Sequence, residues 1–140
     1  MHFVFGGAFN GKRQWVDEYY AMEQTENLSF QHLSRSLAFH KKVYIIEGFT
    51  LWVRERIKTL SINETRGLAR QIIEKIKKEE KDKGAHFVLI GTEVGKGIVP
   101  MEPLDRNFRD VCGYIYQDMI KAASTVDYIW YGIQERLKGE

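Results

Sequence analysis

The sequence predicts an α/β domain whose sheet is mostly parallel and flanked by helices. Two observations indicate this fold class. Short, uninterrupted apolar runs recur along the chain, as is typical of strands buried on both faces of a parallel sheet. Segments with apolar residues at helical spacing separate these runs, and alternating strands and helices favour a parallel α/β sheet. At 140 residues the chain is most simply one domain, residues 1–140, with room for a substantial core.

The apolar runs and the helical spacing give the order of the elements. Strands are expected over residues 2–5, 43–46, 86–90 and 126–131, and helices after residue 12 and over 29–39, 50–60, 61–83 and 104–123. Residues 23–27 are polar and predict a loop. A second loop, rich in glycine and proline, is expected over 91–103, and a short charged tail follows the last strand.

The two longest helices have the clearest signals. Ser61 and Glu64 form an S-x-x-E capping box, in which each side chain accepts a hydrogen bond from a free backbone N–H at the helix start. Gly84 closes the same helix after a mixed-charge run. The helix over residues 104–123 has apolar residues every three or four positions, which predicts a stripe buried in the core and not a cofactor contact.

Composition narrows the class of protein. The net charge of +2 is too small to indicate nucleic-acid binding, and no basic block is interleaved with aromatic residues. A single cysteine, Cys112, excludes an internal disulfide framework and a site with several cysteine ligands. No apolar run has the length of a membrane span, and the first residues lack the pattern of a signal peptide. A cytoplasmic protein is therefore expected.

The most informative motif lies at the first strand-to-helix junction. Gly6, Gly11 and Lys12 follow a P-loop pattern, Gly-x4-Gly-Lys, between an apolar run and a segment of helical spacing. Glycines allow backbone N–H groups to turn inward and close on phosphate oxygens, and the lysine adds a positive charge at the β- and γ-phosphates. The helix that follows directs its positive end to the same place. The alternative is an ordinary glycine turn between a strand and a helix.

One position departs from the pattern. A serine or threonine hydroxyl that would bind Mg²⁺ is expected after the lysine, and this chain has Arg13 there. A permanently charged guanidinium near a divalent ion is repelled by several kcal/mol even at an effective dielectric constant of about 20. Either the side chain turns out of the site, or it neutralises phosphate itself and gives metal-independent binding without turnover.

Two further segments are expected at the same edge of the sheet. Ligands of parallel α/β sheets bind at the carboxyl ends of the strands. Glu47 ends the strand over residues 43–46, an arrangement that resembles a Walker B element and would hold Mg²⁺ or its water, although an acid at a strand end is commonplace. The loop at 92–100 has glycines at 95 and 97, which favours a close approach to a ligand or another backbone.

Three stretches together resemble one known family. Residues 92–100 read TEVGKGIVP and are followed by Phe108-Arg109-Asp110, which is similar to N-E-V-G-x-G-I-V-P and F-R-D in that family. Residues 6–13 read GGAFNGKR against G-G-A-R-S-G-K-S, and residues 43–53 are similar to its Walker B strand and following helix. On these motifs the chain is identified as a shortened, divergent member of the bifunctional adenosylcobinamide kinase/adenosylcobinamide-phosphate guanylyltransferase family of cobalamin biosynthesis, over residues 1–20 and 43–140.

The resemblance implies a P-loop NTPase-like fold, a nucleoside triphosphate (GTP or ATP), Mg²⁺, adenosylcobinamide as the corrinoid acceptor, and a ring-like homo-oligomer. Lys12 and Glu47 would be catalytic, with Glu47 also the metal ligand. The residues implied for nucleotide binding are Gly6, Gly7, Ala8, Phe9, Asn10, Gly11, Lys12, Arg13, Glu47 and, by a loose alignment to a glutamate that contacts guanosine, Glu26. Those implied for the corrinoid or a neighbouring subunit are Glu93, Gly95, Gly97, Pro100, Arg106 and Arg109.

A segment of the family pattern is missing. Family members also accept GMP from GTP on a histidine, which lies in an H-x-x-x-R-like segment after a second strand. Here the chain runs from the first helix almost directly to Thr25-Glu26-Asn27, so we expect the second strand, the histidine segment and guanylyl transfer to be absent. His32 and His40 fall in the next expected helix, match no family motif and are interpreted as surface or packing residues.

Three hypotheses of function remain at this point. The first is a nucleotide-binding adenosylcobinamide kinase-like protein without guanylyltransferase activity, in which Arg13 weakens phosphoryl transfer. The second is a non-catalytic paralogue that binds nucleotide or a partner. The third is a protein that retains only the fold.

Overall fold

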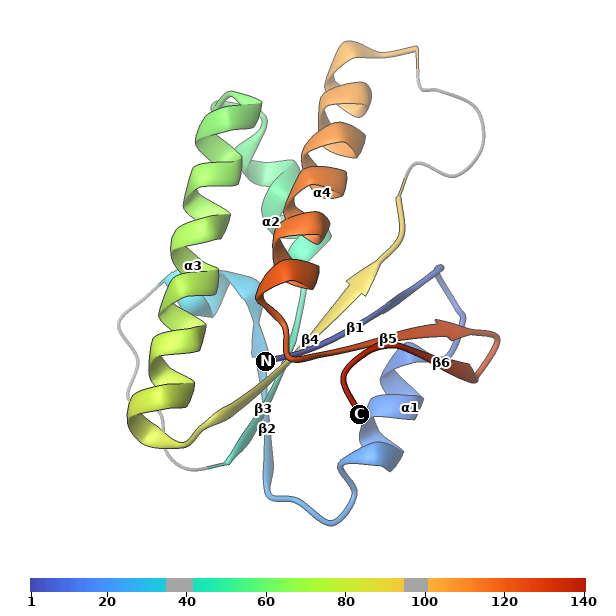
Figure 1. Ribbon diagram of the computed structural model, residues 1–140. Coiled ribbons are helices and arrows are strands. Elements are labelled where there is room, and N and C mark those ends of the chain that lie inside the picture. Colours follow the sequence, from blue (N-terminus) through green and yellow to red (C-terminus); the bar gives the residue numbers. More distant parts are fainter. Residues whose placement is uncertain (35–41, 95–100) are drawn as a thin grey trace.

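The computed structural model describes residues 1–34, 42–94 and 101–140. Its centre is a six-stranded sheet with helices on both faces (Figure 1). In spatial order the strands are β2 (Thr25–Ser29), β3 (Val43–Glu47), β4 (His86–Thr92), β1 (His2–Gly6), β5 (Thr125–Trp130) and β6 (Ile133–Lys138). The five neighbours from β2 to β5 pair in parallel, and β6 pairs with β5 in the antiparallel direction. This confirms the expected P-loop NTPase-like α/β fold.

The helices are divided unequally between the two faces. In chain order they are α1 (Lys12–Tyr19), the short 3-10 helix η1 (Phe30–Ser34), α2 (Phe49–Arg56), α3 (Ile62–Lys83) and α4 (Pro103–Ala122). The helix α1 covers one face with Val16, which packs with Val4 and Ile129 together with Tyr20, the residue that follows the helix. The larger core lies on the other face, where α2, α3 and α4 pack against the sheet (Figure 1).

The predicted start and end of α3 are confirmed. The Ser61 hydroxyl accepts a hydrogen bond from the backbone N–H of Glu64 at 3.1 Å, and the Glu64 carboxylate accepts one from the Ser61 N–H at 3.2 Å. Gly84 follows the last turn with a φ of 67°, a left-handed conformation that favours glycine. Most of the apolar stripe expected on α4 is buried, with Val111, Ile115 and Met119 enclosed, but its first residue, Leu104, is 42% exposed.

Two expectations about the polar segments are wrong, and a third can be checked only in part. Residues 23–27 are not a loop throughout, because β2 begins at Thr25 and forms the edge of the sheet beside β3. The second strand, which we expected to be absent after the first helix, is therefore present. Of the helix expected over 29–39, residues Phe30–Ser34 form a 3-10 helix, and the rest of that range, like His40, lies outside the described residues. The charged tail after β5 is the strand β6.

The register of the sheet places the loop after β1 and the segment after β4 at the same edge of the sheet. Gly6 of β1 pairs with Thr92 of β4, and both strands end there in parallel. The loop that follows β1 therefore lies beside the segment that follows β4. Among the described residues, no helix is long and apolar enough to cross a membrane.

Candidate functional site

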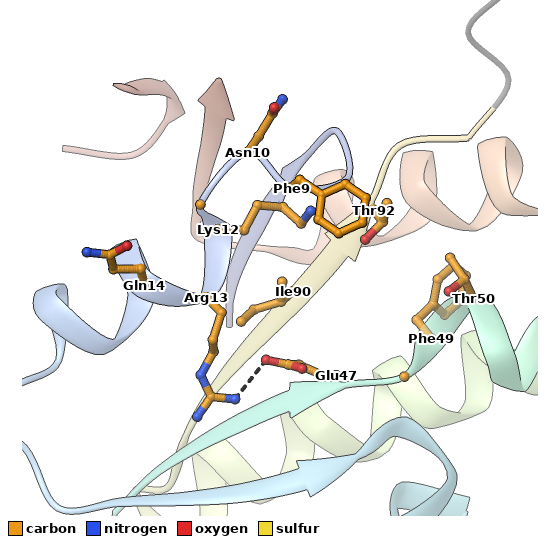
Figure 2. A pocket seen from close by; sticks show the side chains of 12 residues that line it. Phe9, Asn10, Lys12, Arg13, Gln14, Glu47, Phe49, Thr50, Ile90 and Thr92 are labelled. Carbon is orange, nitrogen blue, oxygen red and sulfur yellow. Dashed lines mark hydrogen bonds and ion pairs between the residues drawn. The ribbon is translucent and has the colours of Figure 1, made fainter. Parts of the chain in front are cut away.

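A cavity of about 290 Å³ lies at the carboxyl ends of β1, β3 and β4. It brings together the P-loop residues, Glu47 and Thr92, which come from three separate parts of the chain (Figure 2). The residues that line it are Phe9, Asn10, Gly11, Lys12, Arg13, Gln14, Glu47, Gly48, Phe49, Thr50, Ile90 and Thr92. The ends of these strands therefore converge as expected. Their convergence does not by itself assign a chemical role to any of these residues.

The backbone of the loop over residues 6–13 requires its glycines. A Cβ on Gly6 would lie 2.1 Å from the carbonyl oxygen of Ile129, so only glycine fits against β5. Gly11 has a φ of 84° and immediately precedes α1. The Gly132 N–H, in the turn between β5 and β6, donates a 2.7 Å hydrogen bond to the carbonyl oxygen of Asn10. The β5–β6 hairpin thus supports the loop from outside.

Phe9 stands at the tip of the loop in an unusual conformation. Its φ of 60° is left-handed, which costs a bulky side chain about 1 kcal/mol or more. Its ring is fully exposed and borders the cavity (Figure 2). Ala8 and Gly7 complete the loop without lining the cavity. The conformation directs an aromatic ring to the cavity mouth, where a ligand could cover it.

Lys12 is held inside the loop, with only 8% of its surface exposed. Its ammonium donates a 2.8 Å hydrogen bond to the Gly7 carbonyl oxygen. Burial lowers the pKa of Lys12, although the negative charges of Glu47 and Glu93 partly oppose this effect. A phosphate group that reached the loop would stabilise the charged ammonium and would offer it a stronger acceptor than the Gly7 carbonyl.

Arg13 is turned toward the acid that would bind a metal. Its Nη1 lies 2.7 Å from Glu47 Oε1, as Figure 2 shows by a dashed line. Its Nε donates to Asp17 Oδ1 at 2.9 Å, and its Nη2 donates to Asn27 Oδ1 at 2.6 Å. Burial opposes the charge on Arg13, but the hydrogen bonds to Glu47 and Asp17 outweigh it and raise the pKa of the guanidinium. A positive charge thus stands beside Glu47.

The donors present do not fit a magnesium ion as they stand. Mg²⁺ needs near-octahedral oxygen ligands, and in nucleotide sites it takes one or two carboxylates or hydroxyls from the protein. Here the carboxylate of Glu47 is paired with a guanidinium, and a guanidinium has no lone pair to give. Within residues 1–34, 42–94 and 101–140, no three His, Cys, Asp or Glu side chains are placed to hold a metal ion.

The segment after β4 is only partly described. The backbone N–H of Glu93 donates to the Gly6 carbonyl oxygen at 2.8 Å, and the carboxylate of Glu93 accepts a hydrogen bond from the Tyr128 hydroxyl at 3.0 Å. Glu93 is therefore tied to the start of the P-loop and to β5. Three residues of the expected substrate or subunit loop lie outside the described residues: Gly95, Gly97 and Pro100.

The two arginines expected with that loop do not line the cavity. Arg106 donates a 2.5 Å hydrogen bond to the carbonyl oxygen of Met101, close to its own position at the start of α4. Arg109 contacts the carboxylate of its neighbour Asp110. The structure therefore does not bring these two side chains to the P-loop.

Glu26 is also remote from the cavity. It pairs with Tyr44 in the sheet, three residues before the carboxyl end of β3, and its carboxylate lies 2.7 Å from the ammonium of Lys42. His32, in η1, accepts a 3.2 Å hydrogen bond on Nδ1 from the Ser29 N–H and is exposed. Neither residue lines the cavity.

Several residues of the site were not predicted. Gln14, Phe49 and Ile90 line the cavity, and Asp17 and Asn27 hold Arg13. The spacing of Arg13 and Asp17, four residues apart in a helix, is a signal that could have indicated their contact. Asn27 belongs to a strand that the sequence did not reveal, so its contact had no such signal.

Comparison with known proteins finds one matching family and two related proteins of the same description. A family model described as cobinamide kinase / cobinamide phosphate guanyltransferase matches residues 10–137. The bifunctional adenosylcobalamin biosynthesis protein of Escherichia coli (strain K12) is 43% identical over 54 residues, which are 39% of this chain and 30% of that protein. The protein of the same description from Salmonella typhimurium (strain LT2) has the same identity and coverage. The match thus spans less than a third of each curated relative.

Proposed function

The chain belongs to the cobinamide kinase / cobinamide phosphate guanyltransferase family, and from this premise we propose that it binds a nucleoside triphosphate, GTP or ATP, in the cavity of the P-loop. Its setting would be cobalamin biosynthesis, which the description of the two relatives names. Three features support the site: a glycine loop that admits no Cβ at Gly6, a lysine enclosed by that loop, and the N-terminus of α1 directly behind it.

The ion pair of Arg13 and Glu47 carries the more specific part of the proposal. Arg13 is the second residue of α1 and stands where a metal-binding hydroxyl would be, so its positive charge lies at the cavity that phosphate oxygens would enter. We infer that nucleotide binds here without Mg²⁺. Phosphoryl transfer depends on charge neutralisation and positioning by the metal, so the kinase rate on a cobinamide acceptor should be low or absent.

Other expectations stay within the proposal. Guanylyl transfer is not included, because no stretch of the chain matches the family's histidine segment and neither His32 nor Glu26 lines the cavity. A homo-oligomer is expected from the family resemblance, and a cytoplasmic location from the composition of the chain. A non-catalytic nucleotide-binding paralogue is the second candidate, and the Arg13 ion pair favours it equally.

Substitution of Lys12 tests the site. Calorimetric titration of GTP and ATP in EDTA should show binding to the native chain, and Lys12→Ala should weaken it by about 10-fold or more, because a charge-assisted hydrogen bond to phosphate is lost. Lys58→Ala is the matched control, since Lys58 is exposed and pairs with Glu55 away from the cavity. Equal affinities for the native chain and Lys12→Ala would show that the site is assigned wrongly.

A kinase assay separates the two candidates. Turnover of GTP or ATP with adenosylcobinamide as the acceptor would favour a slow kinase. Tight nucleotide binding without any acceptor phosphorylation would favour the non-catalytic paralogue.

A further inference from the structure

A second cavity, of about 250 Å³, lies between η1, α2 and α3. It shares no lining residue with the P-loop cavity, although α2 contributes to both. The residues that line it are Leu33, Trp52, Arg56, Leu68, Gln71, Ile72 and Lys75. Nothing in the proposed nucleotide chemistry uses this cavity.

Its lining is apolar at the base and positive at the rim. Leu33, Trp52 and Ile72 are each at least 95% buried and form the base. Among the described residues of the lining, the two charged ones, Arg56 and Lys75, are cations, and none is acidic. Lys75 donates a 3.1 Å hydrogen bond to the Leu33 carbonyl oxygen. This cavity therefore combines an apolar base with positive charge at the rim.

The indole of Trp52 supplies an independent observation. Its Nε1–H is buried and finds no hydrogen-bond acceptor among the described residues. Buried donors in folded proteins are almost always paired, and an orphaned one indicates an acceptor that the described residues do not supply. The Arg56 guanidinium lies 5.3 Å from the centre of the same ring. No carboxylate of the described part of the chain pairs with Arg56, which leaves its charge available to a ligand.

We propose that this cavity binds a small organic anion, a carboxylate with a short apolar body. The carboxylate would draw Arg56 off the indole ring and accept hydrogen bonds from the guanidinium and from the uncovered Trp52 N–H. The apolar body would rest on Leu33 and Ile72. The volume lies just below the range of about 300–1,000 Å³ that is typical of drug-sized ligands, so the anion should be smaller than these.

Benzoate is a suitable probe, with benzamide as its neutral isostere and inorganic phosphate as an anion without an apolar body. Binding can be followed by the indole ¹H–¹⁵N signals of the ¹⁵N-labelled protein, with the Trp52 signal identified by its absence in Trp52→Phe. Benzoate should move the Trp52 signal downfield with a Kd of about 1 mM, as expected for so small a ligand. Benzamide and phosphate should bind at least about fivefold more weakly, since each lacks one of the two features.

Two further variants, one at the rim of the cavity and one away from it, keep the test independent of any folding defect in Trp52→Phe. Arg56→Gln should weaken benzoate binding by about 10-fold, because the charge-assisted contact is lost. Lys77→Gln, which removes one positive charge from the opposite side of α3, should leave binding unchanged. Saturable movement of the Trp52 signal that is lost in Arg56→Gln would establish the site. No movement with benzoate, or equal binding of benzamide, or equal loss in both variants, would overturn it.

Discussion

The ion pair of Arg13 and Glu47 predicts the effect of Arg13→Ser. This substitution supplies the hydroxyl that a metal-binding P-loop requires and frees the carboxylate of Glu47. Nucleotide affinity should then depend on Mg²⁺, increasing by about 10-fold or more when the metal replaces EDTA. The native chain should change by less than about twofold under the same exchange.

The magnitude follows from the geometry of the pair. A guanidinium about 4 Å from a divalent ion opposes its binding by about 8 kcal/mol at an effective dielectric constant of about 20, before further screening by solvent and salt. Even one fifth of this, about 1.6 kcal/mol, exceeds a tenfold change in affinity. Stability should suffer little, because the side chains of Arg13 and Glu47 are 40% and 45% exposed, and pairs so exposed contribute only about 0–1 kcal/mol each.

Calorimetric titration of GTP and ATP measures the effect directly. Arg13→Lys is the control, since it keeps the positive charge without supplying a hydroxyl and should stay independent of the metal. Circular dichroism of each variant reports whether the fold is intact. If Arg13→Ser folds and binds nucleotide with the same affinity in Mg²⁺ and in EDTA, the argument that Arg13 displaces the metal is refuted.

Two further predictions concern the packing behind the site. His2 Nε2 lies 2.5 Å from the fully buried carboxylate of Asp127, and burial, against the attraction of Asp127, lowers the pKa of His2 below 6.5. A group with a depressed pKa stabilises the fold above its unfolded value, so the melting temperature should fall as the pH drops from about 7 to 5, and His2→Gln should flatten this decline. Gly6→Ala should unfold the chain or strongly destabilise it, because its Cβ would lie 2.1 Å from the Ile129 carbonyl oxygen. The control, Gly67→Ala in α3, meets no atom within 4 Å and should be neutral or stabilising in thermal melts. An unchanged melting temperature across that pH range, or a normal melt for Gly6→Ala, would contradict these assignments.

The elements that the sequence predicted are those with a strong burial pattern. The strands β1, β3 and β4 are central, and their apolar runs over residues 2–5, 43–46 and 86–90 are visible without a structure. The helix α3 was predicted from Ser61 and Glu64, whose reciprocal hydrogen bonds are local in the chain. Elements that are completely buried, or that are fixed by hydrogen bonds between residues close in the chain, can therefore be recognised from the sequence.

The two edge strands, β2 and β6, have no comparable pattern of apolar residues in the sequence. The strand β2 reads TENLS, and its first three residues are exposed, so no apolar run or alternation marks it. The strand β6 reads IQERLK, with both apolar side chains, Ile133 and Leu137, exposed. The one signal for β6 was Gly132, whose φ of 78° follows a left-handed Tyr131 in a tight hairpin turn. An edge strand is held by backbone pairing, which any sequence can supply.

The candidate site was likewise predicted only in part. The sequence indicated that residues 6–13, Glu47 and Thr92 would meet, because the carboxyl ends of parallel strands share one edge. It left open whether the Arg13 side chain turns out of the site or neutralises phosphate itself. The contact with Glu47, 34 residues away, became visible only in three dimensions.

The role of Arg13 in metal-independent nucleotide binding is tested most directly by calorimetric titration of the native chain with GTP and ATP, once in Mg²⁺ and once in EDTA. Nucleotide should bind at the P-loop cavity with affinities that agree within about twofold in the two buffers, because Arg13 takes the place of the metal at Glu47. Binding that requires Mg²⁺ would contradict the role assigned to Arg13. No binding in either buffer would contradict the proposed nucleotide site itself.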